Sequence, residues 1–414
     1  MNRRLLAISW DMPPLSGPRA VQVSRTLKHL VPLRWESWVV CFGARSSRYH
    51  QDEALAARLR TPNGVTLVPV RSLEERLAFR LLWRVIPPLK LLPDEKWVWI
   101  RDAARAARRL AAERRYDALV SFAQPWSDHL IGRRVHRATG LPWVAHFSDP
   151  WTDSPYLKGA AWQRRIWRRM EADVVREADA LVFVTRQTAD RVMRKYPEDW
   201  LRKVHVVPHG FDPSDRRPDD RGAEAGRPLT LVYTGRFYEG LRSPDTVLRA
   251  LALLAQRRPL SRELRVTFVG PTTPAHRHLA QRLGLDGVVE FTGRLPSAES
   301  TRRAAAADAL LLIDAPAADS LFLPSKLVDY LPLGKPILGL TPSHGAAADL
   351  VRRLGYDVIS PDDVPAIALA VESLIVRHHG GGLGASPVHA DASNAYDIRH
   401  TARQFADILD RCAS

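Results

Sequence analysis

Cysteine and long apolar runs are both scarce in this chain of 414 residues. The two cysteines, Cys41 and Cys412, are too few for a disulfide framework or a cysteine-built zinc site, and their scarcity suits a reducing compartment. No run reaches the roughly 18 apolar residues that a membrane-spanning helix needs. The apolar stretch Leu5–Trp10 ends at Asp11, so it is too short for a signal peptide and favours a first buried strand.

Acidic residues are too few to balance the basic ones, which leaves a formal net charge of +16. Almost the whole excess lies in residues 1–212, and so do all twelve tryptophans, from Trp10 to Trp200. This break in composition predicts two domains with different partners. A basic, tryptophan-rich surface suits an anionic membrane face or nucleic acid. A GC-rich genome explains the preference for arginine over lysine, but it does not explain the neutral second half.

Several catalytic motifs are also missing. The sequence has no G-x-G-x-x-G, P-loop or G-x-S-x-G motif, and no Cys/His pair with a local signature. His276 with His278, and His378 with His379, have no carboxylate set or H-E-x-x-H beside them, so we expect no metal site and no cofactor.

Short apolar runs alternate with amphipathic stretches along the chain, which predicts an α/β fold with parallel sheets covered by helices on both faces. The expected helices include 18–30, 100–114, 243–255 and 394–411. The expected strands are 5–9, 36–42, 65–70, 118–122, 143–147, 180–184, 204–207, 229–233, 265–269, 288–291, 309–313 and 336–340.

The domain boundaries follow composition. Residues 213–228 are polar and contain proline and glycine, which is typical of an interdomain linker. We therefore predict a first domain at 1–212, a second at 229–390, and a last helical segment at 391–414 after the glycine-rich stretch 378–386. In open α/β sheets ligands bind beyond the carboxyl ends of the strands, so informative residues should follow strands.

In the first half, three loops fit this rule. The first contains Ser16, Gly17 and Arg19 before a helix, where backbone amides meet an anion or sugar, although an ordinary strand-to-helix loop fits equally well. Asp149 follows the fifth strand; it can accept a proton from an acceptor hydroxyl, or it can cap the turn before Pro150. Trp151 and His209 are further acceptor-binding candidates, although a plain turn also explains His209. His146 is assigned to the strand interior.

In the second half, Gly235, Arg236 and Arg242 surround a strand-to-helix loop that suits a diphosphate. Gly270 and Arg294 occupy parallel positions after the next two strands. The segment from Pro324 through Ser325 and Lys326 reads as a helix start with free N–H groups. Asp329, one turn further on, suits a ribose diol or merely satisfies the helix dipole.

Together these segments resemble the family 4-type retaining glycosyltransferases of the GT-B fold. The similarity runs in order along almost the whole chain: PPLSGPRA, DPWTD, PHGFD, YTGRFYEGLRS, FVG, FTGRLP and PSKLVDYLPLGKPIL. The last block is the most specific. The resemblance implies two Rossmann-like domains facing across a cleft, with the C-terminal helix returning to the first domain.

The resemblance also implies a donor site for a nucleotide-diphosphate sugar in the second domain. Arg236 and, by looser alignment, Arg242 match a basic pair that holds the diphosphate. Ser325 and Lys326 match the diphosphate-facing helix start. Asp329 matches the second acid of the E-x7-E motif, but the first acid falls on Leu321, a departure for which Asp319 is a substitute candidate.

The retaining chemistry of that family needs no metal, and Asp149 aligns with its acceptor-side position. The expected acceptor is a glycan or a lipid-linked molecule. Two basic segments, 71–115 and 160–176, suit an anionic membrane through Trp83, Trp97, Trp99, Trp162 and Trp167, unless these tryptophans are core residues. The expected location is cytoplasmic or peripheral on the inner face of the cell membrane, in polysaccharide or cell-envelope synthesis.

Three other functions stay open. A sugar-nucleotide epimerase would need cleft acids and bases that the sequence does not place. A non-catalytic binding or scaffolding partner in glycan assembly is favoured by Leu321. Nucleic-acid binding rests on charge alone, and we expect no nucleic-acid partner.

Overall fold

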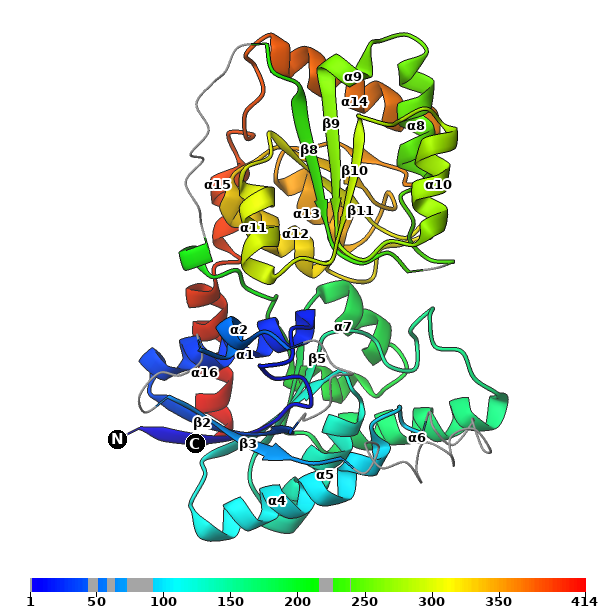
Figure 1. Ribbon diagram of the computed structural model, residues 1–414. Helices are drawn as coiled ribbons and strands as arrows, with labels where there is room; N and C mark the ends of the chain where they lie inside the picture. The colour runs from blue at the N-terminus through cyan, green and yellow to red at the C-terminus, as the bar shows by residue number, and fades with distance from the viewer. Residues whose placement is uncertain (1, 44–50, 58–63, 73–91, 216–225, 239) are drawn as a thin grey trace. The chain divides into compact units, whose positions relative to one another are not determined.

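The computed structural model describes residues 2–43, 51–57, 64–72, 92–215, 226–238 and 240–414 (Figure 1). Its contacts divide the chain into unit 1, Met1–Gly210 with Ile398–Ser414, and unit 2, Phe211–Asp397. The first division, after Gly210, falls two residues before the predicted domain end at 212. The second, before Ile398, falls seven residues after the predicted start of the C-terminal segment at 391. The cleft predicted between the domains stays a prediction.

Unit 1 contains a parallel sheet of seven strands in the order β3-β2-β1-β4-β5-β6-β7. Strands β4 and β5 are buried along their whole length, as a parallel sheet covered on both faces requires. The strands are β1 Arg3–Ile8, β2 Trp35–Phe42, β3 Val65–Val70, β4 Ala118–Ala123, β5 Trp143–Phe147, β6 Ala180–Phe183 and β7 Val204–Val206.

Helices cover both faces of this sheet. On one face, Leu5 and Ala7 of β1 pack with residues of α1 (Pro18–Leu30) and α16 (Ile398–Cys412). On the other, Leu6 and Ile8 belong to a core shared with α4 (Ile100–Glu113), α5 (Ser127–Thr139), α6 (Ala161–Glu177) and α7 (Arg186–Met193). The C-terminal helix therefore belongs to the first domain. Shorter helices are α2 Glu53–Ala57 and the 3-10 helices Val31–Leu33, Trp97–Trp99 and Glu198–Lys203.

Most of the tryptophans in the described residues are core residues. Trp99 and Trp167 are fully buried and Trp97 is partly buried, whereas Trp162 is 47% exposed. Trp83 lies outside the described residues. The suggestion that these side chains meet a membrane is therefore wrong for Trp99 and Trp167, whose indoles fill the space between sheet and helices. Within the described part of the chain, no helix is long and apolar enough to span a membrane.

Unit 2 contains a second parallel sheet, of six strands, in the order β10-β9-β8-β11-β12-β13. The prediction of two parallel α/β domains is confirmed. The strands are β8 Leu229–Thr234, β9 Leu264–Val269, β10 Val289–Gly293, β11 Ala309–Ile313, β12 Ile337–Leu340 and β13 Val358–Ile359. The helices are α8 Asp245–Ala255, α9 Leu260–Glu263, α10 Pro274–Arg282, α11 Ser297–Ala305, α12 Ser325–Tyr330, α13 Ala346–Arg353, α14 Val364–His379 and α15 His389–Asn394, with 3-10 helices at Pro213–Asp215 and Leu331–Leu333.

The end of the predicted linker is part of unit 2. The guanidinium of Arg227 forms a bidentate ion pair with Asp308, which also accepts hydrogen bonds from the backbone and hydroxyl of Thr230. These donors lower the pKa of Asp308 to about 2 in spite of its burial. Residues 216–225 of the predicted linker lie outside the described residues.

Candidate functional site

The strand order of unit 2 reverses between β8 and β11, so loops diverge at this point on the carboxyl edge of the sheet. Ligands of open α/β sheets bind at such switch points. The loop after β8 carries Gly235, Arg236 and Arg242, and the loop after β11 leads to Lys326 at the start of α12. The structure thus brings the predicted donor residues to one edge.

Three glycines allow the loops to stack at this edge. Gly270 has φ +144, and a Cβ added there would lie 2.0 Å from the carbonyl oxygen of Gly235, which itself has φ +141. The Gly270 amide donates to the carbonyl of Gly293 at 2.9 Å, and the Gly235 amide donates to Val269 at 2.8 Å. Only glycine fits at positions 235 and 270, so no side chain covers the backbone at these two points.

Lys326 lies buried beneath this glycine edge. Its Nζ donates to the hydroxyl of Tyr233 at 2.9 Å and lies 4.5 Å from the centre of the same ring. A Cβ added to Gly235 would lie 2.8 Å from Nζ, so the ammonium group packs against the glycine backbone. Burial, and secondly Arg242, hold the pKa of Lys326 well below its usual range. The charged form is thus destabilised until an anion arrives.

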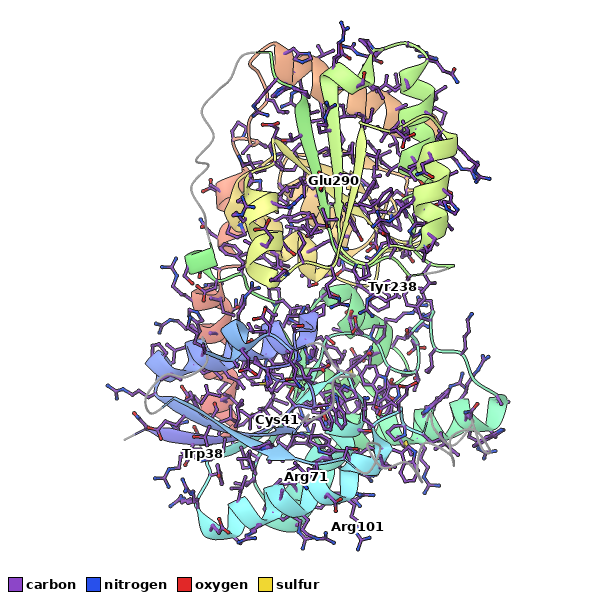
Figure 2. All side chains as sticks on the ribbon, in the orientation of Figure 1. Trp38, Cys41, Arg71, Arg101, Tyr238 and Glu290 are labelled. Atoms are coloured by element: carbon purple, nitrogen blue, oxygen red, sulfur yellow. The ribbon has the colours of Figure 1, made fainter. Side chains whose placement is uncertain are left out.

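Three arginines accompany Lys326: Arg242 acts on the lysine, and Arg236 lies near both Arg242 and Arg294. Arg242 Nη2 donates to the backbone carbonyl of Arg236 at 3.0 Å, its guanidinium carbon lies 5.2 Å from the ring centre of Tyr238 (labelled in Figure 2), and its buried Nε has no hydrogen-bond partner. Burial, and secondly Arg236, lower the pKa of Arg294. Within the described residues, no ion pair links these arginines or Lys326 to a carboxylate. The charge of Arg242 thus opposes that of Lys326, and the charge of Arg236 opposes that of Arg294, an arrangement that would suit a multiply charged anion.

The acid positions near this cluster differ from the E-x7-E expectation. Leu321, where the first acid falls, is 8% exposed and packs inside unit 2, while Asp319 is exposed. Asp329 is exposed one turn into α12, and Ser325, after the N-cap Pro324, is half-buried.

Sequence reasoning missed Asp314, the first residue after β11. Its Oδ2 accepts hydrogen bonds from Ser320 Oγ at 2.8 Å and Thr341 Oγ1 at 3.2 Å. The charge of Asp314 also raises the pKa of Lys326, against the larger effect of burial, so this carboxylate lies near the ammonium group. The available signal was its position directly behind the apolar run of residues 309–313.

The carboxyl edge of unit 1 carries the predicted acceptor residues. Asp149 Oδ2 accepts hydrogen bonds from Ser148 Oγ at 3.0 Å and Gln124 Nε2 at 3.2 Å. Burial raises the pKa of Asp149, although the Ser148 hydrogen bond and the charge of Arg19 act in the opposite direction. A carboxylate with a raised pKa is suited to accept a proton from a hydroxyl.

Arg19 joins two histidines at the same edge. Its Nη2 lies 3.0 Å from His146 Nδ1, and because a guanidinium only donates, His146 accepts through Nδ1 and carries its proton on Nε2. The rings of His146 and His209 are 6.0 Å apart, and burial followed by the Arg19 charge lowers the pKa of both well below 6.5. His146 does lie within β5, as expected, but its contact with Arg19 was not predicted from the sequence. The buried Nε of Arg19 has no hydrogen-bond partner.

One acceptor prediction needs correction, and the one for Gly17 stays a prediction. Trp151 is fully buried and stacks on Trp126, with ring centres 5.0 Å apart, so its indole packs in the core and does not reach a ligand. Gly17 has an ordinary φ of −71°, and a Cβ added there would meet nothing within 4 Å. Its backbone therefore does not require glycine, but the space beside it is open, and Ser16 before it is half-buried.

Within the described residues, no three His, Cys, Asp or Glu side chains are grouped so that they could hold a metal ion.

Comparisons with known proteins agree with this architecture. Residues 20–215 match the family model described as Glycosyltransferase Family 4, and residues 228–377 match that of Glycosyl transferases group 1. D-inositol 3-phosphate glycosyltransferase 2 from Catenulispora acidiphila is 39% identical over 135 residues, which are 29% of this chain and 31% of the relative. The match therefore spans less than a third of that relative.

Two solved structures share the fold along nearly the whole chain. HepE from Anabaena, in complex with UDP, has a TM-score of 0.68 and 16% identity, with 99% of this chain and 100% of that chain covered. Sucrose-phosphate synthase from Thermosynechococcus elongatus has a TM-score of 0.66 and 14% identity, with 99% of each chain covered. The chain belongs to the family 4-type glycosyltransferases and has their GT-B fold.

Proposed function

We propose that this protein transfers a sugar from a nucleotide-diphosphate sugar to a glycan or lipid-linked acceptor, with retention of the anomeric configuration and without a metal ion. The observation that carries the proposal is the cluster of Lys326, Arg236, Arg242 and Arg294 at the switch point of unit 2. These cations lie where a diphosphate meets the glycine edge. The UDP bound to HepE supports a uridine nucleotide as the first donor to test.

The chemistry that we assign to the cluster is charge stabilisation. As the bond between the anomeric carbon and the diphosphate oxygen breaks, negative charge develops on the leaving diphosphate. Arg242 and Lys326 are already held by hydrogen bonds to the Arg236 carbonyl and the Tyr233 hydroxyl, so in this proposal they stabilise the charge without rearrangement, and the exposed Arg236 side chain adds to them. In this proposal they supply the positive charge that a divalent cation provides in other enzymes.

On the acceptor side we assign the proton to Asp149. The acceptor hydroxyl oxygen forms the new bond to the anomeric carbon and passes its proton to the Asp149 carboxylate, whose pKa is raised by burial. Arg19, with its free Nε, is the candidate to hold a polar group of the acceptor. Retention requires attack from the face that the diphosphate leaves.

A second candidate function is a non-catalytic partner in glycan assembly. The observation that favours it is the buried Leu321 at the position of the first motif acid. Such a protein would bind the nucleotide and transfer nothing.

A product assay separates the two functions. The purified chain is incubated with UDP-, GDP-, ADP- and dTDP-sugars and a membrane glycolipid extract, and mass spectrometry detects a hexose addition. Transfer by the wild type that is lost in Asp149→Asn, with NMR showing the retained anomer, supports the proposal. Binding of a nucleotide with no transfer to any acceptor would favour the non-catalytic function, and an inverted product would contradict retention.

A further inference from the structure

The amino-terminal half of α6 presents an unusual surface. Trp162 and Ile166 lie one helical turn apart and are 47% and 37% exposed, and Tyr156 in the preceding loop is 40% exposed. Arg165 and Arg169 are exposed on the same side of the helix, three and seven residues after Trp162. The helix end and its loop lie at the periphery of unit 1 (Figure 1).

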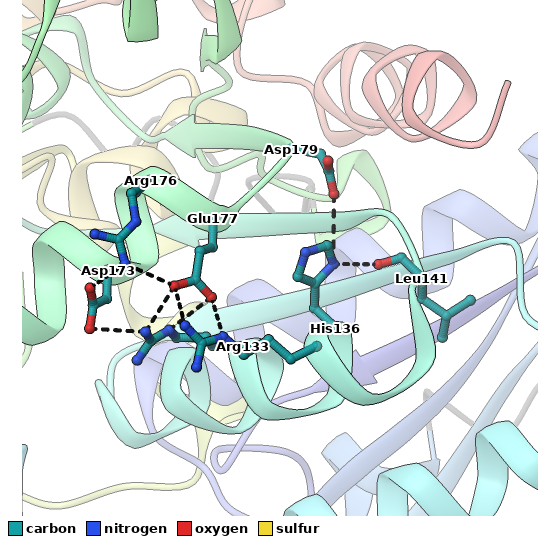
Figure 3. Close-up of polar contacts among 8 residues, drawn as sticks. Arg133, His136, Leu141, Asp173, Arg176, Glu177 and Asp179 are labelled. Atoms are coloured by element: carbon teal, nitrogen blue, oxygen red, sulfur yellow. Dashed lines mark hydrogen bonds and ion pairs between the residues drawn. The ribbon is translucent and has the colours of Figure 1, made fainter.

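The charges of this half contrast with those of the carboxyl-terminal half. There Glu177 pairs with Arg133 at 2.8 Å and with Arg137 at 2.7 Å, and Asp173 pairs with Arg176 at 2.6 Å (Figure 3). In the amino-terminal half, exposed arginines stand at positions 164, 165, 168 and 169, and no ion pair to a carboxylate is found for them among the described residues. Among the described residues, Arg164 alone of these four has a protein acceptor, the carbonyl of Gly159 at 2.9 Å. Their charge is therefore available to an external anion.

The surface is held in place by the core beneath it. A Cβ added to Gly159 would lie 2.5 Å from the ring of Trp167, so the loop packs directly on this buried indole. The Ala160 amide donates to Gln163 Oε1 at 2.8 Å at the start of the helix. Exposure of Trp162 and Ile166 is thus a property of a fixed helix, and not of a loose end.

We propose that this surface, consisting of Tyr156, Trp162, Ile166 and the arginines at 164, 165, 168 and 169, binds the anionic headgroup layer of a lipid membrane. Exposed aromatic and aliphatic side chains enter the boundary between headgroups and acyl chains. Arginines beside them meet lipid phosphates, and each basic residue near an anionic membrane strengthens binding about fivefold. A helix side that exposes both basic and apolar side chains fits an anionic membrane better than a side that exposes only one of the two kinds.

The surface lies on the same chain segment as Asp149. Asp149 is the second residue of the loop from β5 to α6, which ends at the surface. Glu171 of α6 holds this loop: its Oε2 accepts a hydrogen bond from the Thr152 amide at 2.8 Å, and its Oε1 lies 2.6 Å from Lys195 Nζ. If the proposed function holds, on which this step rests, a lipid-linked acceptor is delivered from the bound membrane to Asp149.

Vesicle co-sedimentation of the full chain tests the inference. Wild type should bind vesicles of phosphatidylcholine with 40% phosphatidylglycerol and not those of phosphatidylcholine alone. Trp162→Ser with Ile166→Ser, and separately Arg165→Gln, Arg168→Gln and Arg169→Gln together, should each weaken binding at least tenfold. Matched controls in unit 2 are Leu369→Ser with Val376→Ser on α14, and the triple replacement Arg257→Gln, Arg262→Gln and Arg282→Gln, which should bind as wild type does.

Equal vesicle binding by the surface variants and wild type, or no binding by wild type, would overturn the inference. So would binding of RNA through the same arginines without binding of vesicles, which would assign the surface to another partner. The outcome is separable from the proposed function. If the variants lose vesicle binding but the wild type transfers no sugar, only the proposed sugar transfer is refuted. If the wild type transfers sugar but binds no vesicles, only the proposed membrane-binding surface is refuted.

Discussion

Replacing Lys326 with methionine should weaken diphosphate binding and, in the same variant, stabilise the ligand-free protein. Lys326 Nζ is buried, with the Tyr233 hydroxyl as its hydrogen-bond partner. A hydrogen bond to a charged group contributes about 1.5–3 kcal/mol. Without the hydrogen bond that the Lys326 ammonium group would donate to the diphosphate, the matching nucleoside diphosphate should bind about 10- to 150-fold more weakly.

The stability effect has the opposite sign. The pKa of Lys326 in the folded protein lies below its usual value of 10.5 because burial and Arg242 oppose the charge. Between these two pKa values the unfolded chain binds more protons, so stability rises with pH across that window, and at lower pH the buried charge destabilises the fold. Methionine removes this cost but loses the hydrogen bond to Tyr233, and a net gain of about 1 kcal/mol would raise Tm by about 2–4 °C.

Calorimetric titration and thermal unfolding measure both effects. Diphosphate binding should raise the pKa of Lys326, so wild type should take up protons on binding, and affinity should fall as pH rises through the free-protein pKa. Titrations in buffers of different ionisation enthalpy detect this uptake, which Lys326→Met should reduce. Lys335→Met, at the amino end of β12, is the matched control and should leave diphosphate affinity unchanged. A Lys326→Met protein that is less stable and binds the diphosphate normally would refute the reasoning.

Three further predictions concern other parts of the molecule. Asp149→Asn should lower kcat about 10²- to 10⁴-fold with donor affinity unchanged, because only the proton acceptor is lost; full activity in a steady-state assay would refute this role. Gly270→Ala should lose about 1–3 kcal/mol of stability from backbone strain alone, and more because the new Cβ overlaps Gly235. The control Gly284→Ala, whose Cβ would meet nothing, should cost about 1 kcal/mol. Equal losses for the two variants in denaturant titrations would contradict the stacked loops. Burial opposes ionisation of Glu177, but the arginine hydrogen bonds outweigh it and lower its pKa to about 2, so its contribution is present above pH 4.5 and is lost as pH falls through 2. Glu177→Gln should therefore cost about 1–3 kcal/mol at pH 7 and flatten the pH dependence of unfolding between pH 5 and 2, and an unchanged slope would exclude the ion pairs as its source.

Buried strands were the most predictable part of the fold. The predicted strands 143–147 and 309–313 coincide with the fully buried β5 and β11, because largely apolar runs bounded by polar residues leave little choice of boundary. The predicted strand 65–70 also coincides with β3, although that strand is only partly buried. The two-residue strand β13, Val358–Ile359, was missed because it is too short to show periodicity. The last helix starts at Ile398 and not at 394, since residues 389–394 form the separate helix α15.

The site was predictable as a set of loops, but less so as a set of contacts. Gly235 and Gly270 were found because glycine after a strand marks a close backbone approach. Tyr233 was missed because its position in β8 reads as an ordinary strand aromatic, and its hydroxyl meets Lys326 only in the folded unit. Trp151 was misassigned because a strand-end position does not tell whether a side chain turns into the core.

Composition predicted a difference between the halves but not its use. Trp99 and Trp167 stabilise the core of unit 1, which sequence spacing does not distinguish from a membrane-facing role. Exposure singles out Trp162, and only the folded helix shows that it is accompanied by Ile166 and by arginines that form no ion pair with a carboxylate of the described residues.

The most direct test of the central claim is calorimetric titration of UDP, GDP, ADP and dTDP, each beside its nucleoside, into the wild type and Arg236→Met. If the four cations of unit 2 hold a diphosphate, at least one diphosphate should bind about 100-fold more tightly than its nucleoside, and Arg236→Met should remove most of the difference. If no diphosphate binds more tightly than its nucleoside, the cluster is not a diphosphate site and the proposed donor chemistry is wrong.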